Sequence, residues 1–139
     1  MVEESARVGA DLILLMAVCL EGSLLSELCA QAQEKNMAVL LEVHDEDELE
    51  RALDAKPDCI GVNARDLRTF EVNLETTEAL LPKIPSGFVK VAESGIQTYD
   101  DVLRVNNAGA DAGLIGTAFM KDPGKLGRWT KKLREDFNE

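Results

Sequence analysis

The segment Ala38-Val39-Leu40-Leu41-Glu42-Val43-His44-Asp45 joins an apolar run to a group of polar side chains. A continuous apolar run is typical of a parallel strand that is buried on both faces. Asp45 and Glu48, which follow it, have the spacing of a helix N-terminus. Polar side chains at such a junction lie at the carboxyl end of a parallel sheet, where α/β enzymes place their reactive groups. The segment therefore predicts an α/β fold with a site at this edge.

The same order of apolar run, polar group and helical pattern recurs along the chain. This alternation requires right-handed crossovers and an all-parallel sheet. No linker rich in Pro, Gly or Ser interrupts the pattern, so residues 1–139 are predicted to form a single domain. After a leading helix, the expected strands are 12–18, 38–43, 59–62, 88–92 and 112–116, and the expected helices are 24–35, 46–55, 74–81, 99–108 and 123–135.

Several short patterns mark where the predicted helices begin and end. Thr98 with Asp101 has capping-box spacing, and Asn73 can cap the helix that follows it. Gly9-Ala10-Asp11 and Gly109-Ala110-Asp111 each precede a strand. We interpret them as helix-to-strand connectors in which glycine takes the left-handed conformation. Their recurrence indicates a repeating β/α unit.

The charge of the chain limits its partners. Fifteen basic and 26 acidic residues give a formal net charge of -11. Such a balance repels nucleic-acid backbones and anionic membrane surfaces, so neither is an expected partner. A small anionic substrate remains compatible with it, because backbone amides bind phosphate whatever the net charge. The first residues do not resemble a signal peptide, and no apolar stretch approaches a membrane span, so we expect a cytoplasmic protein.

The cysteines and the single histidine predict neither a metal site nor a disulfide. Cys19, Cys29 and Cys59 are widely spaced, and no CxxC pair exists. Apolar surroundings in the sequence favour buried, reduced thiols. We therefore expect no metal and no cofactor.

Two candidate carboxylates end predicted strands. Glu42 is either a general acid/base with a pKa that is adjusted by partial burial, or a structural carboxylate paired with Arg65 or a backbone amide. Glu93 ends the fourth strand. His44 shares the strand face of Glu42, and we interpret it as a hydrogen-bonded supporting residue rather than a catalyst. The charged run 45–50 is interpreted as a solvated helix face.

The remaining candidates bind rather than react. Asn63 and Arg65 end the third strand and can orient a substrate carboxylate or hydroxyl, although Arg65 can instead pair with a nearby acidic residue. Gly95 permits a close backbone approach to phosphate. The turn of Gly116 and Thr117 after the last strand can do the same. Two such turns after neighbouring late strands are typical of the phosphate site of a TIM barrel.

Taken together, these motifs closely resemble those of indole-3-glycerol phosphate synthase. The matching motifs are Glu-Val-His-Asp at 42–45, Asn-x-Arg-Asp-Leu-x-Thr-Phe at 63–70, Leu-Glu-Thr-Thr at 74–77, Glu-Ser-Gly-Ile at 93–96 and Gly-Ala-Asp-Ala-x-Leu-Ile-Gly-x-x-Phe-Met at 109–120. The resemblance implies a (β/α)8 barrel. It also implies ring closure and decarboxylation of carboxyphenylamino-deoxyribulose phosphate in tryptophan biosynthesis.

Carried over by position, the resemblance assigns a role to each candidate. Glu42, Asn63 and Glu93 would be catalytic, with Glu42 the acid/base near the ring-closing centre. Arg65 and Ser94 would bind the substrate. The phosphate would lie against Gly95, Gly116 and Thr117.

The resemblance also implies that the five strands correspond to strands four to eight of the barrel. A Glu and a Lys on strand one and a Lys on strand three, the expected general acid, have no counterpart here. We therefore expect either a partial barrel or a relaxed, open, doubly wound sheet. Its free edges could pair in a homo-oligomer. The alternatives to a lyase are a non-catalytic half-barrel that retains phosphate affinity, or a sister barrel such as phosphoribosylanthranilate isomerase, whose Asp/Cys pair the motifs disfavour.

Overall fold

The computed structural model describes residues 1–137 and contains one five-stranded parallel sheet. Its strands are β1 (Leu12–Met16), β2 (Ala38–Val43), β3 (Cys59–Asn63), β4 (Val89–Glu93) and β5 (Ala112–Leu114). The helices are α1 (Val2–Arg7), α2 (Ser23–Glu34), α3 (Glu46–Ala55), α4 (Leu74–Leu80), α5 (Tyr99–Asn107), α6 (Thr117–Lys121) and α7 (Gly124–Phe137), with short 3₁₀ turns η1 (Ala17–Cys19) and η2 (Leu81–Lys83). The predicted α/β class is confirmed.

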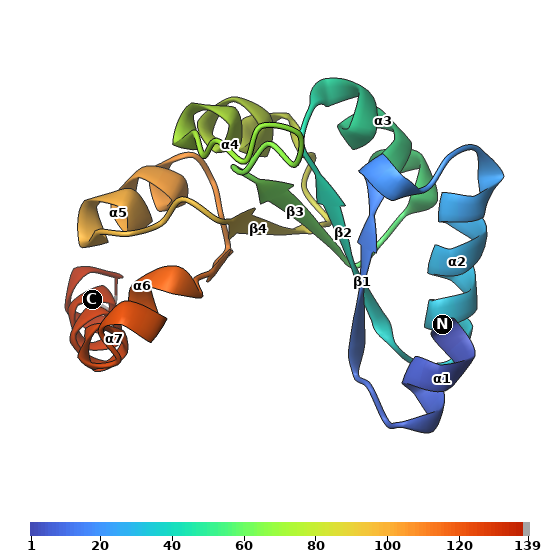
Figure 1. Ribbon diagram of the computed structural model, residues 1–139, viewed down its shortest axis with the longest axis horizontal. Helices are drawn as coiled ribbons and strands as arrows, with labels where there is room; N and C mark the ends of the chain where they lie inside the picture. Colours follow the sequence, from blue (N-terminus) through green and yellow to red (C-terminus); the bar gives the residue numbers. More distant parts are fainter. Residues whose placement is uncertain (138–139) are drawn as a thin grey trace.

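The strands are hydrogen-bonded in their order along the chain, β1-β2-β3-β4-β5. The sheet curves, and the helices lie along its outer, convex side (Figure 1). A doubly wound sheet instead reverses its strand order and has helices on both faces. The molecule is therefore a partial TIM barrel, and the prediction of a relaxed doubly wound sheet is wrong.

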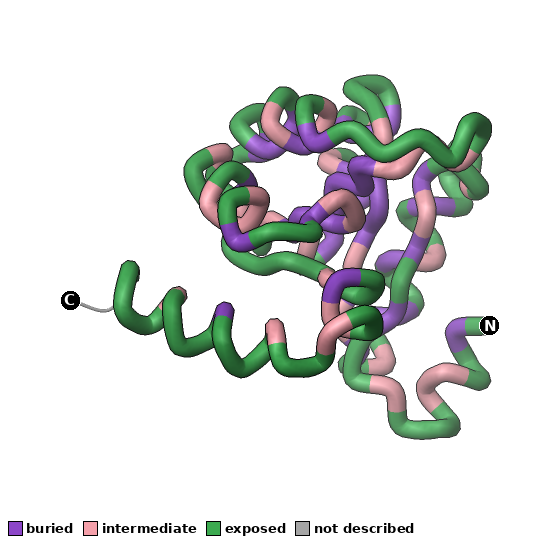
Figure 2. Tube along the Cα trace, turned by 60° about the vertical axis from the view of Figure 1, so that its left-hand side comes forward, coloured by how far each residue is buried: buried purple, intermediate pink, exposed green. Residues whose placement is uncertain are grey.

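The two faces of the sheet differ in burial. Val39 and Leu41 of β2 and Ile60 and Val62 of β3 are completely buried between the sheet and the helices. On the concave face, several large apolar side chains of β1, β4 and β5 remain 45–57% exposed: Leu12, Leu14, Val89 and Leu114. Figure 2 shows the buried residues gathered where the sheet meets its helices. The core thus lies in one layer, and the concave face is open at both edges.

Local hydrogen bonds explain where the helices begin. The Asp45 carboxylate accepts the Glu48 amide N–H at 2.8 Å and thereby begins α3. Thr98 and Asp101 form the predicted capping box at the start of α5. Asn73 accepts the amide N–H of Glu75 at 2.9 Å. These contacts satisfy amide donors that have no partner inside the helix.

The Gly-Ala-Asp connectors also behave as predicted. Gly9 and Gly109 have φ values of 79° and 101°, in the left-handed region that favours glycine. Asp111 then joins the start of β5 to β4, because its carboxylate accepts the Lys90 amide N–H at 2.9 Å. The connector therefore ends a helix and sets the register of the next strand.

Three predictions for residues 12–50 are wrong. The first strand ends at Met16 rather than residue 18, because the chain turns into η1. This turn leaves Cys19 exposed, not buried. The run 45–50 is not a uniformly solvated helix face, since Glu48 is only 7% exposed and Leu49 is buried. The sequence pattern also did not predict α6, whose five residues directly follow the last turn.

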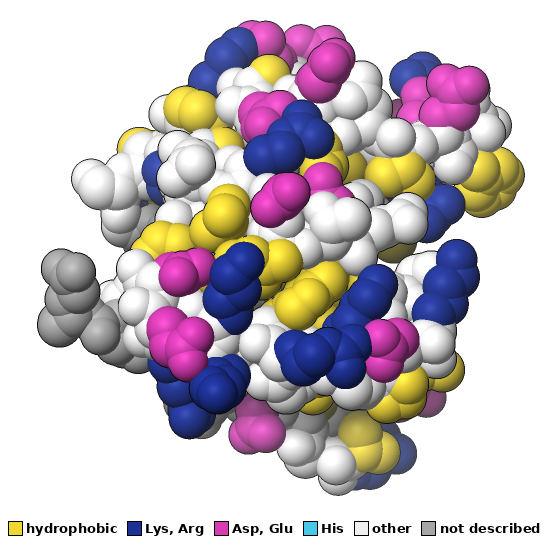
Figure 3. All heavy atoms as spheres, turned by 90° about the vertical axis from the view of Figure 1, so that its left-hand side faces the viewer, with side chains coloured by type: hydrophobic (Ala, Val, Ile, Leu, Met, Phe, Trp, Pro, Cys, Tyr) yellow, Lys and Arg dark blue, Asp and Glu magenta, His cyan; other side chains and the backbone are white. Residues whose placement is uncertain are grey.

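The last helix packs through its aromatic side chain. Trp129 of α7 makes edge-on contacts with Phe119 of α6 and Tyr99 of α5, at ring-centroid distances of 5.3 and 6.4 Å. The Tyr99 hydroxyl donates to Asp136 at 2.7 Å. Figure 3 shows this end of the molecule, where basic and acidic side chains alternate around exposed apolar ones. Among residues 1–137, no helix has the length and apolar character to cross a membrane.

Candidate functional site

Three polar side chains meet at the carboxyl ends of adjacent strands. Glu42 of β2 pairs in register with Gly61 of β3, and Asn63 of β3 pairs with Glu93 of β4. Because side chains alternate along a strand, Glu42, Asn63 and Glu93 all lie on the concave face. Each is at most 9% exposed. The Asn63 amide group donates to Oε1 of Glu42 at 3.1 Å.

Gly61 supplies the space that one of these carboxylates occupies. A Cβ atom at this position would lie 1.8 Å from Oε1 and 2.8 Å from Cδ of Glu93. A glycine inside a strand often marks such a close approach. Sequence reasoning did not single out Gly61, although a glycine within a buried apolar run was the available clue.

Glu93 retains its proton at neutral pH. Burial, and secondly the nearby Glu42 charge, raise the pKa of its carboxyl from 4.5 to about 8. Oε1 of Glu93 has no hydrogen-bond partner in the described residues, 1–137. A buried, protonated carboxyl group is suited to act as a general acid.

His44 connects Glu42 to the beginning of α3. Its Nε2 lies 3.1 Å from Oε1 of Glu42, and its Nδ1 lies 3.0 Å from Oε2 of Glu48. The same Glu48 oxygen accepts the His44 backbone N–H at 2.8 Å. Within residues 1–137, the side-chain hydrogen bond of His44 is therefore to Glu48, and its Nε2 forms none with Glu42. The sequence identified Glu48 as part of a helix start but not as a partner of the His44 side chain.

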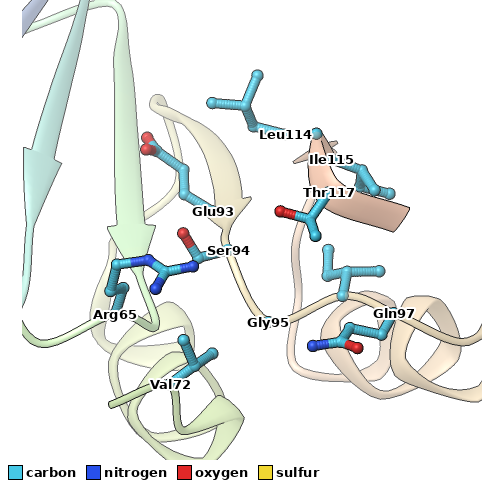
Figure 4. A pocket seen from close by; sticks show the side chains of 11 residues that line it. Arg65, Val72, Glu93, Ser94, Gly95, Gln97, Leu114, Ile115 and Thr117 are labelled. Carbon is cyan, nitrogen blue, oxygen red and sulfur yellow. The ribbon is translucent and has the colours of Figure 1, made fainter. Parts of the chain in front are cut away.

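Arg65 is held in place by the loop after β3. Its backbone N–H donates to the Asn63 side chain at 3.0 Å, and Arg65 forms an isolated antiparallel bridge with Val72. The guanidinium group donates only weakly, to the Phe70 carbonyl at 3.4 Å. Of the ion pairs among residues 1–137, none includes Arg65, so the structural pairing considered for it from the sequence does not form. Figure 4 shows this side chain directed toward Ser94.

The turn after β4 has an unusual backbone. Ser94 and Gly95 have φ values of 62° and 77°, both in the left-handed region. A Cβ on Gly95 would lie 2.9 Å from Leu74 of α4, so the position requires glycine for space as well as conformation. Non-glycine residues with such φ values cluster at ligand-binding sites. The same Cβ would lie 3.1 Å from Val72, the residue that pairs with Arg65, so the turn lies against the loop after β3.

These elements enclose a cavity of about 340 Å³ (Figure 4). It brings together six predicted site residues: Arg65, Glu93, Ser94, Gly95, Gly116 and Thr117. The other two, Glu42 and Asn63, lie beside it on the concave face. Asn63 also lines a neighbouring cavity of about 350 Å³ with His44, Glu48 and Arg65. No three His, Cys, Asp or Glu side chains within residues 1–137 are grouped to hold a metal ion.

Residues 1–131 match the family model described as indole-3-glycerol phosphate synthase. A curated relative with that name from Albidiferax ferrireducens is 50% identical over 120 residues, covering 86% of this chain and 46% of the relative. A relative with the same name from Bacillus velezensis is 48% identical over 139 residues, covering 99% of this chain and 54% of the relative. The chain spans about half the length of these relatives.

Solved structures of lower identity share only the fold. An N-acetylmannosamine-6-phosphate 2-epimerase from Clostridium perfringens superposes with a TM-score of 0.70 at 18% identity, over 95% of this chain and 60% of that chain. A structure described as native KDPGal superposes with a TM-score of 0.68 at 22% identity, over 96% and 63% respectively. The family match and the curated relatives determine the assignment: this chain belongs to the indole-3-glycerol phosphate synthase family.

Proposed function

We propose that this chain supplies one part of an indole-3-glycerol phosphate synthase active site. The reaction closes and decarboxylates carboxyphenylamino-deoxyribulose phosphate, giving indoleglycerol phosphate, carbon dioxide and water. One observation carries the proposal: Glu42, Asn63 and Glu93 converge, buried, beside a cavity that Arg65 and two small-residue turns line. As a biosynthetic enzyme of this class, the chain would act in the cytoplasm.

The two carboxyl groups fit different steps of this reaction. Ring closure needs an acid that activates the substrate ketone, and dehydration needs an acid and a base. Glu93 holds a proton at neutral pH because of its raised pKa. Glu42 accepts the Asn63 N–H at 3.1 Å, and this contact orients its carboxylate for a role as the base. Asn63 would thus orient Glu42 as well as the substrate.

The other end of the cavity suits the phosphate and hydroxyl groups of the substrate. Arg65 provides a cation that no carboxylate in residues 1–137 neutralises through an ion pair. Ser94 and Thr117 provide hydroxyl groups at opposite walls, and Gly95 and Gly116 provide backbone close to the space between them. A guanidinium group and glycine-rich turns recognise phosphate oxygens well.

The chain alone does not contain every group that the reaction needs. Among residues 1–137, no lysine lies at the carboxyl end of a strand: Lys90 is inside β4, and Lys121 ends α6. We propose that a complementary segment, corresponding to barrel strands one to three, supplies the missing lysines and completes the site. The second candidate, a non-catalytic half-barrel with phosphate affinity, is favoured by the same lack of lysine.

Turnover should therefore depend on the complementary segment. We expect the chain alone to form no detectable indoleglycerol phosphate. Mixed with the N-terminal half of the Bacillus velezensis relative, it should form product, and Glu42→Gln should abolish that product. Product formation is followed by indole fluorescence. Glu50→Gln is the matched control, because Glu50 is an exposed residue of the adjacent helix α3.

The outcomes separate the two candidate functions. Product from the chain alone would contradict the need for a complement. An assembled mixture without product, whose cavity still binds inorganic phosphate, would favour the half-barrel scaffold over the lyase.

The open edges of the sheet predict self-association when the complement is absent. β1 and β5 each have a strand neighbour on one side only, and Leu12, Leu14 and Leu114 expose 45%, 47% and 57% of their surface. Such apolar edges favour pairing with another chain. Light scattering should give a mass of at least two copies for the chain alone and a one-to-one complex after the complement is added. A monodisperse monomer would contradict this proposal.

A further inference from the structure

Glu48 is a buried carboxylate that the proposed chemistry leaves without a role. It is 7% exposed and lies on α3, one turn from the site. Its Oε2 accepts the His44 backbone N–H at 2.8 Å and lies 3.0 Å from Nδ1 of the same residue. The backbone contact alone would serve to start the helix and would need no imidazole. The second contact therefore calls for a separate explanation.

The contact with Glu48 determines how the imidazole ring of His44 is protonated. An ionised carboxylate only accepts hydrogen bonds, so Nδ1 of His44 must donate to it. Nε2 then faces Oε1 of Glu42 at 3.1 Å, although no well-aligned hydrogen bond forms there. Two lone pairs at this distance repel each other. The pair is stable only when a proton lies on one of the two atoms.

The surroundings favour placing that proton on His44. Oε1 of Glu42 already accepts the Asn63 N–H at 3.1 Å, so one of its lone pairs is engaged. The imidazole lies between two carboxylates on β2 and α3, and the side chain is 13% exposed. The cavity next to the imidazole is lined by Asp45 and by charged residues of the loop after β3: Arg65, Asp66, Arg68 and Glu71. Glu93 of β4 faces Glu42 from the other side.

We propose that Glu48, His44 and Glu42 form a carboxylate–imidazole–carboxylate chain in which His44 is a positioning residue that orients Glu42 and shares one proton with it. This inference rests on the proposed acid/base function of Glu42. When Glu42 takes a proton from the substrate, the Nε2 proton of His44 leaves to solvent through the cavity that His44 and Glu48 line, and neutral His44 keeps its Nδ1–H toward Glu48. When Glu42 gives its proton up again, Nε2 regains a proton from solvent by the same route.

The single histidine of the chain makes a direct test possible. Long-range ¹H–¹⁵N NMR of the imidazole, recorded without substrate between pH 5 and 9, reports its tautomer and its titration midpoint. We expect Glu42→Gln and Glu48→Gln each to lower that midpoint by about one pH unit or more, because each removes a neighbouring negative charge. Glu50→Gln should leave the midpoint unchanged. An unchanged midpoint in Glu42→Gln would overturn the proposal.

Activity gives an independent measurement in the complemented enzyme. His44→Gln should lower kcat at least tenfold with little change in KM, and it should move the pH profile of kcat. An unaltered kcat and pH profile would also overturn the positioning role. If Glu48→Gln does not fold, the titration of Glu42→Gln alone tests the proposal. That variant is expected to fold, because its glutamine still offers an acceptor to the Asn63 N–H. The titration requires no turnover, so it stays informative even if the proposed lyase activity fails.

Discussion

Gly61→Ala is expected to destabilise the chain by about 1–3 kcal/mol, the usual cost of overpacking a buried site. The new Cβ would lie 1.8 Å from Oε1 of Glu93 and 3.2 Å from Cδ1 of Leu40. Glu93 is 3% exposed and has little room to move. An alanine should otherwise stabilise a strand relative to glycine, so the sign of the change identifies the clash. Urea denaturation measures the free energy of unfolding.

Two further variants test the cause of that loss. Gly127→Ala in α7 places a Cβ where nothing beyond its chain neighbours and the local helix backbone lies within 4 Å, and it should stabilise the chain by about 0.5–1 kcal/mol. Combining Gly61→Ala with Glu93→Asp should recover part of the lost stability, because the shorter side chain withdraws its carboxyl from the new methyl group. If Gly61→Ala proves as stable as the parent chain, Glu93 does not occupy the position described here.

Much of the fold follows from local sequence. The bounds of β2 and α3 agree with the predicted 38–43 and 46–55 to the residue. An uninterrupted apolar run and an Asp cap, both within the segment 38–48, specify these boundaries locally. The elements that depend on distant contacts were less predictable. β1 ends early and α6 forms unpredicted, because no side-chain cap marks either boundary.

The sequence predicts which residues form the candidate site, but not which of them contact one another. Strand periodicity places Glu42, Asn63 and Glu93 on one face, because that requires only the alternation of side chains. It does not show that Gly61 makes room for Glu93, since the register between β3 and β4 decides which residues meet. The burial of Glu48 likewise depends on how α3 lies against the loop after β3.

The structure also distinguishes two carboxylates that the sequence presents as equivalent. Oε1 of Glu42 lies within 3.1 Å of both Asn63 and His44. Oε1 of Glu93 has no such partner within residues 1–137. Burial beside the Glu42 charge favours the neutral form of Glu93, whereas Asn63 and His44 lie against the carboxylate of Glu42. An acid and a base can therefore coexist at one pH, as the proposed reaction requires.

Glu93→Gln is expected to stabilise the chain at alkaline pH by several kcal/mol. The folded-state pKa of Glu93, about 8, lies above the ordinary value of 4.5. Between these two pH values the unfolded chain releases a proton that the folded chain retains, so the wild type loses about 1.4 kcal/mol of stability per pH unit. A neutral glutamine of similar size has no proton to lose. The two chains should therefore be similarly stable near pH 4.5 and diverge as the pH rises to 8.

Urea denaturation at pH 5, 6.5 and 8 measures this divergence, with Glu50→Gln as the exposed control that should follow the wild type. A constant difference between Glu93→Gln and the wild type across the three pH values would contradict the raised pKa of Glu93. In the complemented enzyme the same variant should lose turnover, because glutamine cannot donate the acid proton. Greater stability with lost activity would mean that the carboxyl is retained for chemistry, at a cost to the fold. A structural carboxylate would give the opposite result, since its replacement would weaken the fold at every pH at which it is ionised.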